Sequence, residues 1–225
     1  MKSMVSANVF QIKTKPHGIE RLNEFLEKGF IAIGWPGIGD LTEVDREEIR
    51  TRLKEKYGYV GQQLAYTLGA VNTFVNVMSK GDIVLVRDGE YVHIGIIGPY
   101  RYVEELDNDD DGMCHQRATK WIATVKRSDL NADVQSLVAN RNSVSKFPHP
   151  TEMAELDKVA GLEKYVSHPT QSTEWDRGSL PQANDRANDL NKAWSVLTQA
   201  LDSSNEMIRV QAAIAILNHA MTSAR

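Results

Sequence analysis

The dipeptide Asp88-Gly89 is the feature that most constrains the fold of this chain. It separates two runs of strand-forming residues, 82–87 and 91–97. A two-residue Asp-Gly connection favours a type I′ turn, whose twist matches that of paired antiparallel strands. The sequence therefore predicts a β-hairpin here. Further strands or helices must pack on it, because an isolated hairpin is at best marginally stable in water.

Hydrophobic periodicity predicts both strands and helices around this hairpin. Segments rich in β-branched and aromatic residues predict four more strands, at residues 5–14, 30–35, 117–125 and 144–147. Apolar residues at helical spacing predict helices at residues 19–28, 42–57, 64–79, 128–140 and 151–166. Thr42 with Asp45 resembles a capping box, and Ser128 or Asp129 is expected to begin the helix before residue 140. The mixture predicts an α+β fold with five or more strands.

Composition excludes several classes of protein. The chain has 225 residues with a net charge of −4 and a pI near 5.9, which argues against coating nucleic acid by bulk charge. A local basic face remains compatible with these values. Cys114 is the single cysteine, so no disulfide can form within the chain. No apolar run suits a membrane span and no signal-peptide layout is visible, so we expect a cytoplasmic protein.

The chain is predicted to have three parts. Residues 1–150 form the first domain, residues 151–182 form a helix and a polar linker, and residues 183–225 form a helical hairpin. In the hairpin, apolar residues recur at alternating spacings of three and four, which gives two matched seams. The seams must dock on the first domain, on a second copy or on a protein partner. The candidate contact residues are Trp194, Leu197, Leu201, Ile214 and Leu217.

The order of several short motifs in residues 5–148 resembles a known family. These motifs are FIAIGW at 30–35, GDL at 39–41, GDIV at 81–84, GIIGPYRY at 95–102, HQR at 115–117 and RSDL at 127–130. They are similar to the PUA-like, EVE-type N-terminal module of Mrr-type restriction endonucleases. Residues 13–18 depart from the Gly-rich turn expected there, and the residues after 150 are typical of linker and helices rather than of a nuclease.

The resemblance implies a PUA-like (EVE-type) twisted β-barrel with surrounding helices. It also implies a pocket with aromatic walls that holds a flipped, modified base. We therefore expect a non-enzymatic nucleic-acid reader, with DNA favoured over RNA as its ligand. The alternative is a protein-interaction or adaptor module, related to defence or phage biology, that acts through its C-terminal helices. The acidic pI favours this alternative.

Aromatic and basic residues are the candidates for contact with nucleic acid. Trp35 follows an apolar strand and precedes a Pro/Gly loop, which would fix a stacking platform. Tyr100 and Tyr102 share one face of an extended segment, and Arg101 points the opposite way. Ordinary core or strand-end packing explains these aromatic rings equally well.

A basic cluster surrounds a second tryptophan in the middle of the chain. Basic residues interleaved with an aromatic residue are typical of a nucleic-acid groove, although charged runs are often simply solvated. The adjacent histidine could donate to a phosphate or serve a structural role. The members of this group are His115, Arg117, Lys120, Trp121 and Arg127.

Neither a metal nor a cofactor is predicted. Asp107, Asp109 and Asp111 match the start of an EF-hand loop, but the twelfth position is Ala118 rather than a bidentate Glu. Cys114 has no second cysteine with which to hold zinc. No Gly-rich phosphate loop and no catalytic constellation is visible in the sequence.

Overall fold

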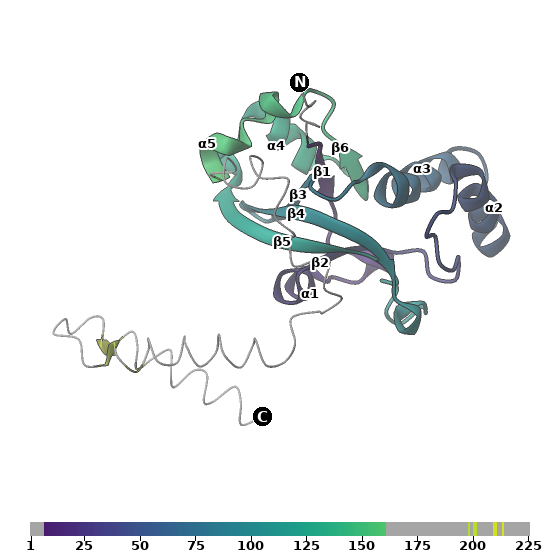
Figure 1. Ribbon diagram of the computed structural model, residues 1–225, viewed down its shortest axis with the longest axis horizontal. Helices are drawn as coiled ribbons and strands as arrows, with labels where there is room; N and C mark the ends of the chain where they lie inside the picture. Colours follow the sequence, from purple (N-terminus) through teal and green to yellow (C-terminus); the bar gives the residue numbers. More distant parts are fainter. Residues whose placement is uncertain (1–6, 161–197, 199, 202–208, 211–212, 214–225) are drawn as a thin grey trace, which may run out of the picture. The chain divides into compact units, whose positions relative to one another are not determined.

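Six strands form one mixed sheet in the computed structural model, which describes residues 7–160, 198, 200, 201, 209, 210 and 213 (Figure 1). The strands are β1 (Val9–Ile12), β2 (Phe30–Ile33), β3 (Ile83–Asp88), β4 (Tyr91–Tyr102), β5 (His115–Lys126) and β6 (Val144–Lys146). Their order is β2-β5-β4-β3-β1-β6. Strands β1 and β3 are parallel, and the other neighbours are antiparallel. The predicted α+β class and the count of five or more strands are confirmed.

The Asp88-Gly89 hairpin is present, and its second strand is longer than predicted. Asp88 pairs with Tyr91, and Gly89 adopts a φ of +54°. Strand β4 continues through Gly98 and Pro99, where the sequence predicted its end. The pairing of β4 with β5 shifts register between Ile97 and Tyr100. Because such a shift removes residues from the hydrogen-bond ladder, it accommodates a proline that lacks an N–H.

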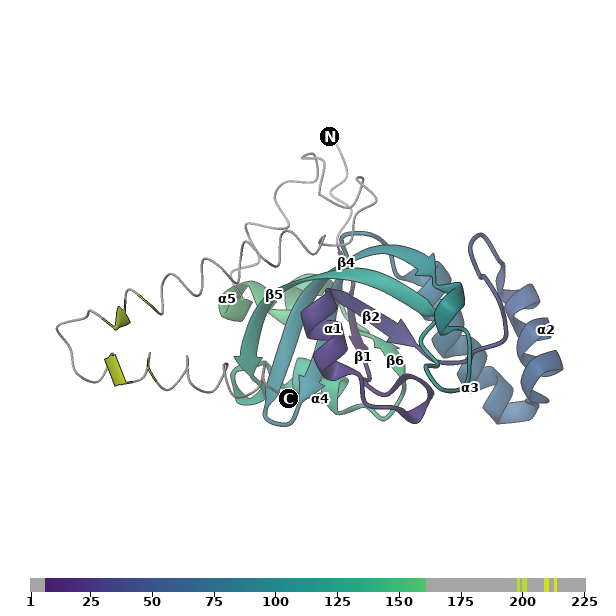
Figure 2. The same cartoon turned by 90° about the horizontal axis from the view of Figure 1, so that it is seen from below.

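The predicted closed barrel is wrong, because the sheet stays open. Strand β2 forms one edge and β6 the other, and no strand pairing joins them within residues 7–160. The long strands β4 and β5 instead curve (Figure 2), so that β2 and β1 come to line one cavity. A Cβ built on Gly34, just after β2, would lie 2.6 Å from the backbone nitrogen of His17, just after β1. The residue after β2 therefore packs closely against the turn that follows β1, with no hydrogen-bond ladder between these two strands.

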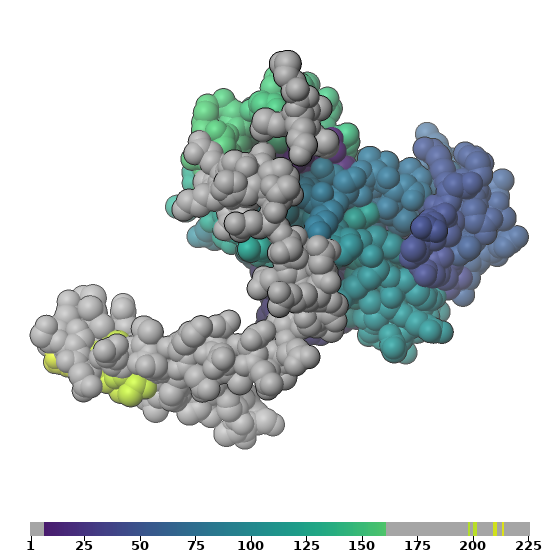
Figure 3. Space-filling view, viewed as in Figure 1, coloured from purple at the N-terminus to yellow at the C-terminus, as the bar shows by residue number. Residues whose placement is uncertain are grey.

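Helices cover both faces of the sheet. The helices are α1 (Leu22–Lys28), α2 (Arg46–Tyr57), α3 (Gly61–Asn72), α4 (Ala132–Ala139) and α5 (Leu156–Ala160). Helices α2 and α3 form a lobe beside the sheet (Figures 1 and 3), and α3 continues into a π-helical turn, Thr73–Val77. One core contains Phe25 of α1 and Ile49 of α2. A second core on the other face contains Val134 of α4 and Leu156 of α5.

Helix boundaries differ from prediction where another side chain provides the cap. Asp45 alone caps α2 by accepting from the N–H groups of Glu47 and Glu48, and Thr42 bonds to Asp40 instead. Asn131 caps α4, because Arg127–Asp129 forms a separate 3₁₀ turn.

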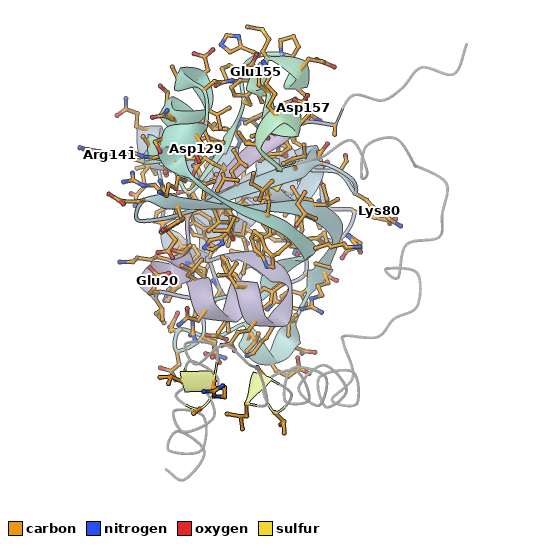
Figure 4. The ribbon with its side chains drawn as sticks, turned by 90° about the vertical axis from the view of Figure 1, so that its left-hand side faces the viewer. Glu20, Lys80, Asp129, Arg141, Glu155 and Asp157 are labelled. Atoms are coloured by element: carbon orange, nitrogen blue, oxygen red, sulfur yellow. The ribbon has the colours of Figure 1, made fainter. Side chains whose placement is uncertain are left out.

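The predicted helix at 151–166 is interrupted within its described part. Glu155 has a φ of +51° and separates the 3₁₀ turn Thr151–Ala154 from α5. Glu155, at the break, and Asp157, in α5, both carry exposed side chains (Figure 4).

The chain divides into two units, Met1–Asp176 and Arg177–Arg225. Most of the predicted C-terminal hairpin lies outside the described residues, including Trp194, Leu197, Ile214 and Leu217. Leu201 is described and is 36% exposed. Among the described residues, no helix is both long enough and apolar enough to cross a membrane.

Candidate nucleic-acid interface

A cavity of about 290 Å³ lies between the end of β2 and the end of β1 with the turn that follows it. One wall comes from the end of β1 and the turn after it, within residues 12–18, and another from residues 32–35 at the end of β2. The turn after α2 and Ser143 complete the lining. Ile12 and Ile33 line it from strands that do not pair with each other. Its volume is close to the lower end of the range for small-ligand pockets, about 300–1,000 Å³. The open sheet therefore provides a concave site that suits one small planar group.

Three aromatic side chains line this cavity. Trp35, Tyr57 and Tyr59 are all partly exposed. The Tyr57 and Tyr59 rings stack with their centroids 5.0 Å apart and their planes 16° from parallel. Gly58 makes this possible, because its φ of +66° ends α2 and turns the chain back. Burial raises the pKa of Tyr57, whose hydroxyl donates to the Pro36 carbonyl at 2.6 Å.

Two residues that line the cavity have a positive φ, which is uncommon outside glycine and is an outlier for a residue as bulky as tryptophan. Trp35 has a φ of +70° and His17 a φ of +51°. A bulky residue at positive φ is an outlier, and a residue before proline normally prefers extended backbone. Such strain costs of order 1–3 kcal/mol and persists where surrounding contacts impose it, most often at functional sites. These conformations mark the cavity as a candidate functional site.

Two glycines allow the turn at His17 to approach both the sheet and the acidic loop at residues 107–112. Gly34 would place a Cβ against the backbone of His17 on one side. Gly112 would place a Cβ against the His17 side chain on the other, and its own φ is +58°. Residues without a Cβ are therefore required on both sides of this turn.

We expect Gly34→Ala to lower the free energy of unfolding by about 1–3 kcal/mol, because overpacking against fixed backbone atoms cannot be relieved by a rotamer change. Urea unfolding measures the effect. Gly69→Ala in α3 is the matched control, since a Cβ there meets nothing within 4 Å. Alanine in a helix is favoured over glycine by roughly 0.5–1 kcal/mol, so this control should be at least as stable as wild type. If Gly34→Ala and Gly69→Ala have the same free energy of unfolding, the close approach of Gly34 to His17 is contradicted.

Lysine side chains surround the aromatic walls. Lys13 and Lys15 line the cavity, and the Lys56 ammonium group lies against Gly37, two residues after Trp35. Burial and then the charge of Arg87 lower the pKa of Lys13. Lys15 is exposed and lies 4.0 Å from a carboxylate oxygen of Glu20. The cavity is therefore flanked by lysines, and carboxylates of Glu20, Asp107 and Asp109 also lie near its rim.

Of the residues predicted from sequence, Tyr100, Tyr102 and His115 lie together behind the Trp35 loop. His115 pairs across the sheet with Ile33, just before that loop. Tyr100 shares a hydrogen bond of 2.9 Å with Nδ1 of His115, and the Tyr102 ring is centred 5.9 Å from the imidazole. His115 is buried, and burial lowers its pKa to about 4. It is neutral at pH 7 and has no exposed surface in this conformation, so the contact of His115 with nucleic acid stays a prediction.

Arg117 was predicted to contact phosphate, and the structure gives it another role. Its side chain is buried, and it donates to the carbonyls of Phe74, Val75, Met78 and Gly98 at 2.7, 2.9, 2.8 and 3.1 Å. Three of these carbonyls lie at the end of the π-helical turn, where helical partners run out. Burial lowers the pKa of Arg117 to about 10, so it stays charged at neutral pH. Arg117 caps a helix and is inaccessible to a ligand.

The remaining predicted residues lie away from the cavity lining. Arg101 points to the opposite face, as predicted, and donates to Oε1 of Gln116 at 2.6 Å. Trp121 donates from Nε1 to the Phe25 carbonyl at 2.7 Å and packs on the core. Lys120 is exposed on β5, and Arg127 begins the turn after that strand. The structure thus keeps Trp35 at the cavity and separates it from the predicted basic cluster.

A second cavity, of about 520 Å³, lacks aromatic walls. Its lining includes Arg21, Arg87, Glu24 and Asp88, so charges of both signs meet there. Within the part of the chain that the structure describes, no group of three or more His, Cys, Asp or Glu residues could hold a metal ion. The cavity beside Trp35 is therefore the better candidate for a planar ligand.

Comparison with known proteins places the chain in a family. A family model described as a domain of unknown function (DUF8426) matches residues 12–146. The chain belongs to the DUF8426 family. The matched segment runs from the last residue of β1 to the last residue of β6, so it contains every residue that lines the aromatic cavity. The cavity is therefore part of the DUF8426 region itself.

Two further comparisons say little about the ligand of this DUF8426 protein. No curated protein matches it. Among solved structures it is similar to the YTH domain of Zygosaccharomyces rouxii MRB1 protein, solved in complex with N6-methyladenosine RNA. The identity is 16%, the match covers 68% of this chain and 86% of that one, and the TM-score is 0.32, which is too low to carry an argument. Neither comparison links the chain to Mrr-type enzymes, so that part of the resemblance stays a prediction.

Proposed function

We propose that this DUF8426 protein binds nucleic acid by accepting one extruded base into the aromatic cavity. The observation that carries the proposal is the sharing of one cavity by three aromatic rings and two lysines, Trp35, Tyr57, Tyr59, Lys13 and Lys15. A base has a π-face that stacks on aromatic side chains for about 1–3 kcal/mol. The few kcal/mol that extrusion costs must be regained in such a pocket.

The lysines provide the complementary half of the proposal. Each base in a strand is flanked by phosphates, and Lys13, Lys15 and Lys56 stand around the aromatic walls. A phosphate near Lys13 would favour the charged form of this lysine, whose pKa is lowered by burial and then by the charge of Arg87. The protein acts as a reader in this proposal, without catalysis. Discrimination between modified and unmodified bases resides in the cavity.

Binding to an oligonucleotide panel tests the proposal. The panel contains single-stranded and duplex DNA and RNA, with and without methylated cytosine and adenine, at two salt concentrations. Anisotropy of a labelled strand should show binding that weakens with salt and that differs between modified and unmodified bases. If the protein binds no member of the panel at low salt, the proposal fails. The alternative is then an adaptor that acts through its C-terminal helices.

We expect Lys15→Ala to weaken binding to every oligonucleotide alike and to reduce the slope of log affinity against log salt by about one unit. The reason is that one fewer phosphate contact releases one fewer counterion. Lys120→Ala is the matched control, because Lys120 is exposed on β5 away from the cavity lining. If Lys120→Ala lowers the slope and Lys15→Ala does not, the phosphate path runs along β5 instead.

A further inference from the structure

The acidic loop after β4 makes contacts that a role as a solvated charged loop does not explain. Asp107 is partly buried and accepts three hydrogen bonds. Oδ1 accepts from the Gly37 N–H at 2.5 Å and from the Cys114 thiol at 3.2 Å. Oδ2 accepts from the Tyr102 hydroxyl at 2.5 Å. One carboxylate thus joins the end of β4 and the residue before β5 to the loop that carries Trp35.

The Gly37 contact controls the conformation of that loop. Residues 35–37 hold two positive φ angles, +70° at Trp35 and +80° at Gly37. On one side the Tyr57 hydroxyl donates to the Pro36 carbonyl, and on the other Asp107 accepts from the Gly37 N–H. A strained conformation persists only where the surroundings over-determine it. These two bonds hold the segment between Trp35 and Gly37 from two sides.

The charge state of Asp107 suits this role. Burial acts to raise the pKa of the Asp107 carboxyl, but the bonds from Tyr102, Gly37 and Cys114 outweigh it and hold the pKa below its usual value. The carboxylate is therefore ionised at neutral pH. Hydrogen bonds to an ionised acceptor are roughly twice as strong as those between neutral groups.

The same loop also supports the other wall of the cavity. Arg21 donates to the backbone carbonyls of Asp110 and Asp111, and Gly112 lies against the His17 side chain. Residues 107–112 therefore contact both the Trp35 loop and the His17 turn.

The geometry points to Asp107 as the positioning residue of the aromatic pocket: its carboxylate, through the Gly37 N–H, holds Trp35 in the orientation that stacks on a base. This inference rests on the proposed function for its ligand. The positioning of Trp35 itself can be measured without any ligand.

Fluorine NMR of protein labelled with 5-fluorotryptophan gives that measurement. The chain has four tryptophans, and Trp35→Phe identifies the Trp35 signal by its loss. In Asp107→Ala we expect the Trp35 signal to shift or broaden, while the Trp121 signal stays in place. Asp107→Asn keeps an oxygen for the Gly37 N–H and should restore most of the wild-type spectrum.

Two control variants separate positioning from other effects of the loop. Asp110→Ala removes the same charge from the same loop but no side-chain bond to Gly37, and Tyr102→Phe removes only the donor to Oδ2. Both should leave the Trp35 signal unchanged. A Trp35 signal that is unchanged in Asp107→Ala, or moved equally by Asp110→Ala, overturns the inference. If Asp107→Ala fails to fold, the residual shifts in Asp107→Asn decide. A small shift of the Trp35 signal alone supports positioning through the weaker neutral acceptor, whereas no Trp35 shift, or an equal shift of the Trp121 signal, overturns the inference.

Binding supplies the second readout. With the oligonucleotide that wild type binds best, Asp107→Ala should lose roughly tenfold in affinity, the order of one stacked base, with an unchanged salt slope. A reduced salt slope would contradict positioning and indicate an electrostatic role. If wild type binds no oligonucleotide, the proposed function fails, and the fluorine spectra still decide whether Asp107 positions Trp35.

Discussion

Replacing Arg117 by Met is expected to lower the free energy of unfolding by about 3 kcal/mol or more. Met keeps most of the apolar stem but leaves the carbonyls of Phe74, Val75, Met78 and Gly98 without their donor. Each buried polar group left unpaired costs about 1–3 kcal/mol. Replacing both partners of a buried polar pair can be neutral, but here the four backbone acceptors remain.

Urea unfolding of Arg117→Met, Arg117→Lys and wild type measures this effect. Lysine restores a charge and three donors but not the planar fork of five, so its stability should be intermediate. Because Arg117 is buried, Arg117→Met should bind oligonucleotides with the salt slope of wild type, although it removes a positive charge. A Met variant that is as stable as wild type and has a salt slope lower by about one unit would restore Arg117 as a phosphate contact.

Trp35→Ala is expected to weaken binding of the preferred oligonucleotide by about 10- to 100-fold, as the loss of one stacked base at ~1–3 kcal/mol implies. Preference between modified and unmodified bases should disappear, while the salt slope stays that of wild type, because the lysines remain. Titration against the same panel at two salt concentrations gives all three quantities.

Trp35→Gly and Trp121→Phe are the controls for this result. Glycine adopts a φ of +70° without strain, so Trp35→Gly should be more stable than Trp35→Ala by about 1 kcal/mol and bind equally poorly. Trp121 packs on the core beside α1, so Trp121→Phe should keep its affinity. Trp35→Ala that retains wild-type affinity and base preference would remove Trp35 from the site.

Local sequence signals predicted the elements of the sheet but not its edges. Asp88-Gly89 determined the hairpin, and apolar runs located all six strands. Closure of a barrel depends on a hydrogen-bond ladder between strands that are distant in sequence. Nothing in residues 30–35 or 144–147 indicates that these two strands do not pair. What replaces the ladder is the contact of His17 with Gly34, and a lone glycine after a strand does not identify its partner.

The candidate site was predicted in part for a similar reason. Trp35 was visible because a Pro/Gly loop follows an apolar strand. Tyr57 and Tyr59 were missed because Tyr57 also fits the apolar spacing of α2, although the Tyr-Gly-Tyr pattern at a helix end was a usable signal. Arg117 was assigned to a solvent-facing cluster because charge is visible in a sequence and burial is not. Lys13 and Lys15 belong to the segment that departs from the expected Gly-rich turn, and only the fold shows that they share a cavity with Trp35.

Ultraviolet cross-linking of a bound oligonucleotide, followed by mass-spectrometric mapping of the modified peptides, tests the central claim most directly. If one base enters the aromatic cavity, cross-links should map to Trp35 and to the Tyr57–Tyr59 turn, with neighbouring adducts at Lys13 or Lys15. Trp35→Ala should abolish the first of these adducts. If cross-links are confined to Lys120, Trp121 and Arg127, with none in the cavity, the claim that a base enters the cavity is contradicted. Nucleic acid would then bind along β5.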